Sequence, residues 1–254
     1  MFVLLACVFQ GCDCARSAVD IIKSDPRYNP ALHSFDYCDI TCGRLPFPPA
    51  SAHVATLIFV LSALHPNDIP NALLSARRAL APGGVLLLRD YAVYDMAMMR
   101  FKKDAKIADR FYRRGDGTRS YFFERKELIQ MLRNAGFLVN EDKQGANNKN
   151  NNNSVDVAVP DDSASKLDSN SNGCDNNTSA AAGAAAGAAA GAAAAAAASA
   201  AVASGGSNGR GDVEGEVVYV KRTVTNRADG IVMKRTWIHA LVPVNPDWVD
   251  PEPL

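Results

Sequence analysis

The sequence has few cysteines, no net charge and no long run of large apolar side chains. Six Cys in 254 residues, unevenly spaced, do not match the dense disulfide framework of a small secreted protein. Basic and acidic residues are equal in number, 27 of each, so whole-chain charge predicts no polyanionic partner. The apolar residues 1–11 are fewer than the ~20 that span a bilayer, and no Lys or Arg precedes Arg16 to start a signal peptide. We predict a buried strand here, with a short signal as the less favoured alternative, and no membrane partner.

Composition divides the chain into four parts. Residues 1–143 and 215–245 are mixed and periodic, and 246–254 form a short tail. Residues 144–214 combine an Asn run with an Ala/Gly tract and have almost no large apolar side chains. Such a segment cannot bury enough surface to offset the entropy lost on ordering. We predict a domain over 1–143, a disordered insertion over 144–214, and a C-terminal part over 215–245 that completes the sheet of the domain.

Short apolar strands alternate with helical patterns in the first part. Strands are predicted over residues 3–10, 34–38, 54–61 and 84–89, and helices over 15–23, 69–80 and 125–135. Continuous apolar strands separated by amphipathic helices indicate a parallel sheet covered on both faces, and hence a doubly wound α/β fold.

The C-terminal part has a different pattern. Two β-rich runs, 216–226 and 231–242, flank the turn residues 227–230, which predicts an antiparallel hairpin at one edge of the sheet. We expect its first strand to continue from residues 136–141, with the insertion looped out between them at little cost in loop-closure entropy.

Three acidic residues follow predicted strands. Asp13 follows the first, Asp39 the second, and Asp90 lies in "RDYAVYD" after "GVLLL". Ligands of doubly wound sheets bind beyond the carboxyl ends of the strands, where a carboxylate can accept hydrogen bonds from ribose hydroxyls or an amino group. The alternative is that each Asp caps the next helix or turn; three strand ends in register weaken that alternative.

Residues 100–126 concentrate positive charge. They contain ten Lys or Arg and four acids, a net charge of +6, interleaved with six Phe or Tyr. Cationic side chains neutralise phosphates and aromatic rings stack on unpaired bases, so we predict a nucleic-acid surface. The alternative is a solvated charged face over core aromatics. The side chains assigned to RNA are Arg89, Arg100, Lys102, Lys103, Arg110, Arg113, Arg114 and Arg119.

A metal site is the weaker interpretation of the cysteines. Neither the Cys12–Cys14 spacing nor the Cys38–Cys42 spacing matches the knuckles of structural zinc sites. We predict reduced cysteines and no metal. His65 and His239 are isolated in the sequence and are predicted to be structural.

Four strings carry a resemblance to a known family. They are "IFVLSALHP" (58–66), "LLRDYAVYDMAMMRFKK" (87–103), "FYRRGDGTRSYFF" (111–123) and the late "KRTVTNR…MKRTWIHA". They closely resemble the S-adenosylmethionine-dependent tRNA 3-methylcytidine methyltransferases, and the match skips only the insertion. The resemblance implies a Rossmann-like class I methyltransferase sheet whose last strand is antiparallel. It also implies an enzyme that forms 3-methylcytidine at position 32 of tRNA anticodon loops.

The resemblance also implies a cofactor site for S-adenosylmethionine. Asp13, with Cys14, would hold the ribose hydroxyls, and Asp39, with Ile40, would flank the adenine. The strand end with Ile58, Phe59 and Leu61 would lie beside the methionine part.

Methyl transfer to cytosine N3 leaves a cationic base, so a nearby carboxylate would stabilise the developing charge. Asp90 is the first candidate for this carboxylate and Asp95 is the alternative. Tyr91 is expected to act as a stacking or hydroxyl partner.

The sequence departs from the family in its N-terminal part. Its members have an upstream strand, a glycine-rich loop for the amino-acid end of the cofactor and an N-terminal tRNA-binding extension, but no G-x-G pattern precedes residue 11 here. We expect a chain that lacks the first strand and loop and binds the cofactor very weakly; micromolar binding in calorimetry would contradict this. The alternative function is a non-catalytic RNA-binding or scaffold subunit. Expected partners are the tRNA anticodon stem-loop and an accessory protein such as an aminoacyl-tRNA synthetase, in the cytoplasm or, as the alternative, the nucleus.

Overall fold

The structure is a computed structural model of the whole chain, and it describes residues 8–141, 214–225 and 232–251. The strands are β1 (Phe9–Asp13), β2 (His33–Tyr37), β3 (Ala52–Ile58), β4 (Leu80–Tyr91), β5 (Lys106–Ala108), β6 (Phe111–Arg113), β7 (Arg119–Tyr121), β8 (Glu216–Thr225) and β9 (Val232–Pro243). The α-helices are α1 (Arg16–Ser24), α2 (Ile69–Ala79), α3 (Met96–Arg100) and α4 (Arg125–Asn134). The 3-10 helices are η1 (Ile40–Cys42), η2 (Leu61–Ala63), η3 (Pro66–Asp68) and η4 (Lys103–Ala105). No helix in these ranges has the length and apolar character needed to cross a membrane.

The largest sheet has the strand order β3–β4–β9–β8 and combines parallel with antiparallel pairing. β3 and β4 are parallel, whereas β9 runs antiparallel to both β4 and β8. The predicted α/β fold with an antiparallel hairpin at the sheet edge is therefore confirmed. The predicted turn at 227–230 lies outside the described residues.

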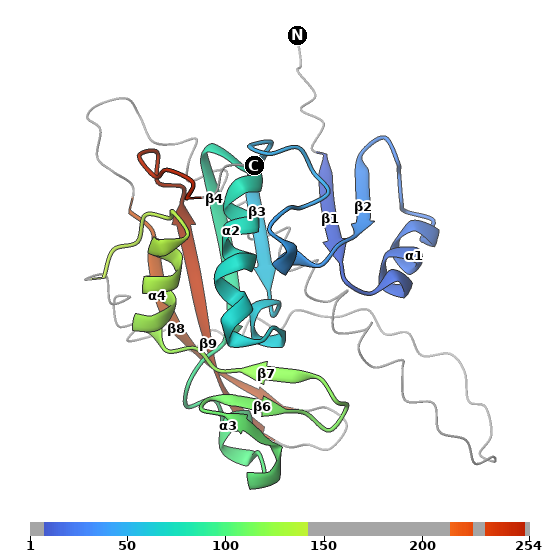
Figure 1. Cartoon of the computed structure of the whole chain (residues 1–254). Helices are drawn as coiled ribbons and strands as arrows, with labels where there is room; N and C mark the ends of the chain where they lie inside the picture. Colours follow the sequence, from blue (N-terminus) through green and yellow to red (C-terminus); the bar gives the residue numbers. More distant parts are fainter. Residues whose placement is uncertain (1–7, 142–213, 226–231, 252–254) are drawn as a thin grey trace, which may run out of the picture.

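A second, two-stranded sheet contains β1 and β2, which are parallel. Figure 1 shows this pair beyond the β3 edge of the larger sheet, and no hydrogen-bonded pairing joins β1 to β3 in the part of the chain that the structure describes. The first strand was predicted too early, at 3–10. It spans Phe9–Asp13 because Gly11, Cys12 and Asp13 pair with the second strand, and residues 1–7 lie outside the described residues.

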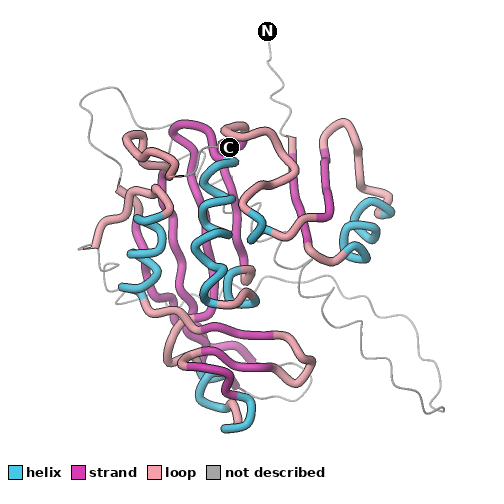
Figure 2. The backbone as a smooth tube through the Cα atoms, viewed as in Figure 1, coloured by secondary structure: helices cyan, strands magenta, loops and turns pink. Residues whose placement is uncertain are grey.

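One face of the four-stranded sheet forms the core under α2 and α4. Figure 2 shows both helices in front of the strands. The apolar face predicted for α2 is confirmed, since Ile69, Ala72 and Leu73 are fully buried. On α4, Leu128 and Leu132 are buried in the same cluster. Burial of each of the Ile and Leu side chains contributes roughly 1.5–3 kcal/mol to stability. The packing of α2 and α4 on this face therefore stabilises the sheet.

Two strand predictions need correction. β4 was predicted to start at residue 84 after a loop, but it begins at Leu80, directly after α2, because Leu80 already pairs with Ala52 across an irregular register. Residues 136–141 do not run on into β8. They lie beside it, where Val139 forms an isolated bridge with Gly215. The two flanks of residues 142–213 are therefore adjacent in space.

The third sheet, β5–β6–β7, carries much of the basic segment. Figure 1 shows β6 and β7 below the carboxyl end of β3, and β7 contacts η2, which follows that strand. The prediction that the aromatic side chains of this segment stack on bases is wrong for four of them, which are buried in the protein: Phe111, Tyr121, Phe122 and Phe123.

Candidate functional site

The carboxyl ends of β3 and β4 bring three aromatic rings together. Phe59 follows β3 in the left-handed conformation, with φ 55°, which turns the chain away from the sheet. Its ring lies 4.8 Å from that of Tyr91 and 6.1 Å from that of Trp237, centroid to centroid. Trp237 pairs with Tyr91 across β4 and β9. These three residues, here called the aromatic cluster, form the centre of the candidate site.

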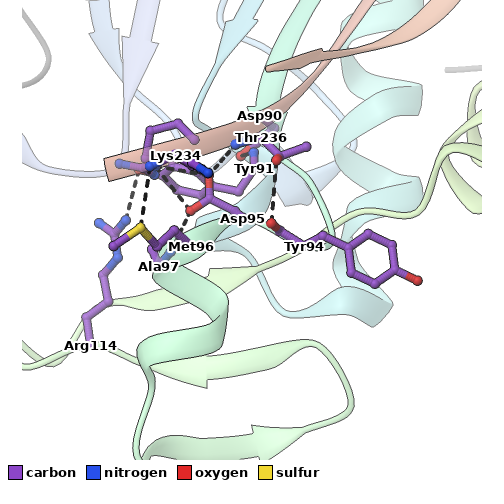
Figure 3. A network of polar contacts seen from close by, with 10 residues as sticks. Asp90, Tyr91, Tyr94, Asp95, Met96, Ala97, Arg114, Lys234 and Thr236 are labelled. Atoms are coloured by element: carbon purple, nitrogen blue, oxygen red, sulfur yellow. Dashed lines mark hydrogen bonds and ion pairs between the residues drawn. The ribbon is translucent and has the colours of Figure 1, made fainter. Parts of the chain in front are cut away.

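Tyr91 is half-buried, unlike the two carboxylates predicted with it. Its hydroxyl accepts a hydrogen bond of 2.8 Å from Nη2 of Arg114 (Figure 3). The guanidinium groups of Arg114 and Arg235 lie 5.2 Å and 5.4 Å from the centre of its ring. Tyr91 is thus the member of the predicted catalytic set that a substrate can touch.

Asp90 points inward. The residue is fully buried; its Oδ1 accepts from the backbone N–H of Tyr91 at 2.8 Å and its Oδ2 from that of Ser62 at 3.1 Å. Desolvation raises the pKa of Asp90 from 3.8 to about 6, although hydrogen bonds from Ser62, Tyr91 and Leu61 oppose the shift. The carboxylate ties η2 to the end of β4, so the geometry gives Asp90 a positioning role, and its predicted contact with a base stays a prediction.

Asp95 is also fully buried and is occupied by three donors. It caps α3 by accepting from Ala97 N–H at 2.8 Å, and it accepts from Thr236 N–H at 2.8 Å and from Nε of Arg235 at 2.9 Å. Figure 3 shows this network, with the ring of Tyr94 turned away from it. Asp95 therefore joins the start of α3 to β9 and orients Arg235 toward Tyr91.

Trp237 and Arg235 belong to the site but were not predicted from the sequence. Both lie far from Tyr91 along the chain and reach it only through the pairing of β4 with β9. The signal was available in "MKRTWIHA", where Arg235, Trp237 and His239 alternate onto one face of a strand.

A second pair of functional groups lies at the ends of β1 and β2. Asp13 and Asp39 are exposed neighbours, since Cys38 N–H donates to the carbonyl of Asp13 at 3.0 Å. Oδ1 of Asp13 accepts from Ala15 N–H, and Oδ1 of Asp39 accepts from Thr41. Backbone and hydroxyl hydrogen bonds from Thr41 lower the pKa of Asp39. Each Oδ2 remains available in the described structure, as a ligand with hydroxyl or amino donors requires.

The other residues predicted to line the cofactor site have mixed positions. Cys14 is exposed beside Asp13, and Ile40 packs partly against the core. Phe59 belongs to the aromatic cluster, whereas Ile58 lines a separate cavity over the four-stranded sheet. Leu61 is fully buried, so the structure places its side chain in the core instead of beside a ligand.

The predicted RNA-binding cations also divide. Five are exposed on or near the β5–β6–β7 sheet: Arg100, Lys102, Lys103, Arg113 and Arg119. Arg110 is instead held by Glu127 at 2.6 Å and by Asp109 at 3.2 Å, so it acts as a structural ion pair between β6 and α4. Arg114 is bound to Tyr91, and the guanidinium of Arg89 stacks 4.0 Å over the ring of Trp237.

Comparison with known proteins identifies the fold family. The model of the methyltransferase domain family matches residues 8–141, more than half of the chain. The chain belongs to this methyltransferase family. The match covers the aspartates at the ends of β1 and β2 and the Tyr91 strand end, so both groups of candidate residues lie inside the methyltransferase domain.

Individual relatives support the same family assignment. The tRNA N(3)-cytidine methyltransferase METTL2 of Danio rerio is 50% identical over 128 residues, 49% of this chain and 36% of that protein. METTL6 of Mus musculus, with the same activity in its name, is 45% identical over 134 residues, 51% of this chain and 48% of that protein. The matched part of the chain thus spans less than half the length of these relatives. Among solved structures, an S-adenosylmethionine-dependent methyltransferase from Methanosarcina mazei has a TM-score of 0.49 and 12% identity, covering 92% of this chain and 81% of that one.

Proposed function

We propose that the chain is an S-adenosylmethionine-dependent methyltransferase that forms 3-methylcytidine at position 32 of tRNA anticodon loops. The observation that carries the proposal is the aromatic cluster at the ends of β3 and β4, beside the exposed cations of the β5–β6–β7 sheet. The names of relatives at 50% and 45% identity support the chemistry and the class of RNA.

The residues at the site fit that reaction. Cytosine N3 lies in a base pair in helical RNA, so the base must be presented unpaired in a pocket. The half-buried ring of Tyr91 offers a stacking face, and stacking on an aromatic ring contributes about 1–3 kcal/mol per base. The same ring face favours the cationic methylated base, since a cation is attracted to an aromatic ring. Arg114 and Asp90 hold Tyr91 in place, through its hydroxyl and its backbone N–H.

The cofactor would supply an electrophilic methyl group when bound. Asp13 and Asp39 fit its nucleoside end, because each is exposed and keeps one carboxylate oxygen available for a ribose hydroxyl or an adenine amino group. The weak cofactor affinity expected from the sequence stays a separate prediction, which calorimetry tests.

Labelled methyl transfer tests the proposal. The chain is incubated with tRNA transcripts and with S-adenosylmethionine at millimolar concentration, which compensates for weak affinity. Tyr91→Ala removes the stacking face and should lower methyl incorporation about 5- to 150-fold, from 1–3 kcal/mol of stacking. His53 is exposed on β3, and His53→Gln serves as the control. Its methyl incorporation should equal that of the wild type. Unchanged incorporation in Tyr91→Ala would remove Tyr91 from the site.

A second candidate is a non-catalytic RNA-binding or scaffold subunit. The separation of the β1–β2 pair from the four-stranded sheet favours it, since no described pairing joins β1 to β3, whose carboxyl ends carry the candidate cofactor residues. Binding of tRNA without any methyl transfer, at every cofactor concentration, would support this candidate over the enzyme.

A further inference from the structure

Three cysteines lie together where β1 and β2 end. Cys12 is on β1, Cys38 directly follows β2, and Cys42 is the last residue of η1. All three are free thiols. The sulfur atoms of Cys38 and Cys42 are 3.9 Å apart, and the thiol of Cys12 forms a hydrogen bond with that of Cys38. Thiols this close to one another can be converted to a disulfide when one of them is oxidised.

The three thiols differ in their exposure to solvent. Cys42 is exposed, whereas Cys12 and Cys38 are half-buried. Burial, followed by the hydrogen bond with Cys42, raises the pKa of Cys38 to about 12. Burial, followed by the charge of Asp13, raises the pKa of Cys12 to about 11. The thiolate is the form that reacts with oxidants, and both half-buried thiols keep their protons at pH 7. Cys42 is therefore the sulfur that an oxidant in the solvent meets first.

A bond between Cys38 and Cys42 would close a small loop around residues 39–41. Both flanks of this loop are held in place. The backbone N–H of Cys38 donates to the end of β1 at 3.0 Å, and Nη1 of Arg78 donates to the carbonyl of Gly43 at 3.1 Å. Bonded sulfurs lie about 2 Å apart, so the two sulfurs must approach each other from 3.9 Å. Because the flanks are held, residues 39–41 have to take up this movement.

Asp39 lies within the loop that would be closed. Its Oδ1 accepts hydrogen bonds from the backbone N–H of Thr41 at 2.9 Å and from the hydroxyl of Thr41 at 2.7 Å. These two hydrogen bonds fix the direction of the carboxylate. Thr41 is the residue before Cys42, so a movement of the Cys42 sulfur toward Cys38 disturbs both of them. Oxidation of the thiols would thus change the orientation of Asp39 beside Asp13.

We propose that Cys38 and Cys42 form a reversible disulfide, and that this bond weakens the binding of a nucleoside at Asp13 and Asp39. The disulfide itself is argued from the contact between the two thiols. Its effect on binding rests on the proposed function, which assigns the nucleoside end of the cofactor to these two aspartates. The pair would make cofactor binding sensitive to oxidants.

The oxidant is a peroxide, and the reaction proceeds in two steps. The thiolate of Cys42 attacks a peroxide oxygen, so that an S–O bond forms, the O–O bond breaks, and the leaving hydroxide takes up a proton to become water. The sulfur of Cys38 then attacks that of Cys42. An S–S bond forms, the S–O bond breaks, and the leaving hydroxide takes the proton of the Cys38 thiol. In total the two thiols lose two electrons and two protons, and hydrogen peroxide is reduced to water. A dithiol such as dithiothreitol reverses the reaction by thiol–disulfide exchange.

The first test is peptide mapping of the full chain after treatment with hydrogen peroxide. Trypsin cleaves after Arg27 and Arg44 and releases one peptide, 28–44, that contains both cysteines. The reduced peptide should react with N-ethylmaleimide at both thiols. The disulfide form should react at neither and should be lighter by two hydrogens. A bond between Cys12 and Cys38 would instead join this peptide to peptide 1–16. Dithiothreitol should restore alkylation at both positions.

Two serine variants identify the sulfurs involved. Cys42→Ser should leave Cys38 open to alkylation after peroxide treatment. Cys42 is exposed, so this variant should fold normally. Cys12→Ser is the matched control, because Cys12 also contacts Cys38 but does not belong to the proposed bond. It should form the disulfide within peptide 28–44 as the wild type does.

The second test measures the effect on binding, with adenosine as the probe. Ligand-observed NMR detects weak binding, and it needs neither methyl transfer nor RNA. The oxidised wild type should bind adenosine about tenfold more weakly than the reduced wild type, as expected for the loss of one hydrogen bond to a charged group. Cys42→Ser should bind adenosine equally with and without peroxide.

Two results would overturn the proposal. One is the absence of a disulfide within peptide 28–44 after peroxide treatment. The other is equal adenosine affinity of the oxidised and the reduced wild type, which would leave the proposed function intact. If neither form binds adenosine, the nucleoside site of the proposed function is wrong and the effect on binding fails with it.

Discussion

Replacing Asp90 with Asn should change the pH dependence of folding stability. Asp90 is fully buried, and desolvation raises its pKa from 3.8 to about 6. Because the folded-state pKa lies above the unfolded one, folding favours the protonated acid. The stabilisation is complete below pH ~4 and is lost as the pH rises through about 6. A shift of about two units corresponds to roughly 3 kcal/mol.

The measurement is the free energy of unfolding of both proteins by denaturant, across pH ~4 to 8. The wild type should lose about 3 kcal/mol relative to Asp90→Asn over this range, because Asn does not titrate. Asp116→Asn is the matched control. Asp116 is exposed, and hydrogen bonds from Thr118 lower its pKa. The wild type should therefore gain slightly in unfolding free energy relative to Asp116→Asn as the pH rises, the opposite of the change at Asp90. The reasoning would be refuted if the unfolding free energy of the wild type minus that of Asp90→Asn stayed constant or increased with pH. Such a result would mean that the donors from Ser62 and Tyr91 outweigh desolvation.

Two further predictions concern packing and RNA contacts. Gly136→Ala should destabilise the fold by about 2–4 kcal/mol in denaturant unfolding, because Gly136 has φ 86° and an added Cβ would lie 2.4 Å from the ring of Trp248. Gly117→Ala, with φ 83° and open space around it, should cost only about 1 kcal/mol; equal costs would contradict the packing argument. Arg119→Gln should weaken binding of a stem-loop RNA and lower its salt slope without loss of stability, since Arg119 is exposed. Arg110→Gln should instead reduce stability and leave the salt slope unchanged, because its partner Glu127 is only partly exposed; the reverse pattern would contradict the assignment.

Sequence pattern predicted the parts of the fold that depend on local periodicity. The apolar face of α2 and the hairpin of β8 and β9 were found because a 3.6-residue or 2-residue period marks them directly. The start of β1 was missed, because the apolar residues before it resemble a strand as strongly as the strand itself.

The candidate site was only partly predictable, since its members meet through tertiary pairing. The strand end with Tyr91 could be located from its sequence, but Trp237 joins it from a strand about 145 positions later. Charge composition identified the basic segment, but it did not show which of its side chains form ion pairs within the protein. Arg110 and Arg119 look alike in the sequence, yet only the fold brings Glu127 to Arg110. Burial of Asp90 and Asp95 likewise depends on η2 and β9 and has no local signal.

The most direct test of the central claim is nucleoside mass spectrometry of tRNA incubated with the chain and S-adenosylmethionine that carries an isotopically labelled methyl group. The account predicts labelled 3-methylcytidine that maps to position 32 of the anticodon loop, strongly reduced in Tyr91→Ala. Label in a different nucleoside, or tRNA that binds and acquires no label at millimolar cofactor, would contradict it.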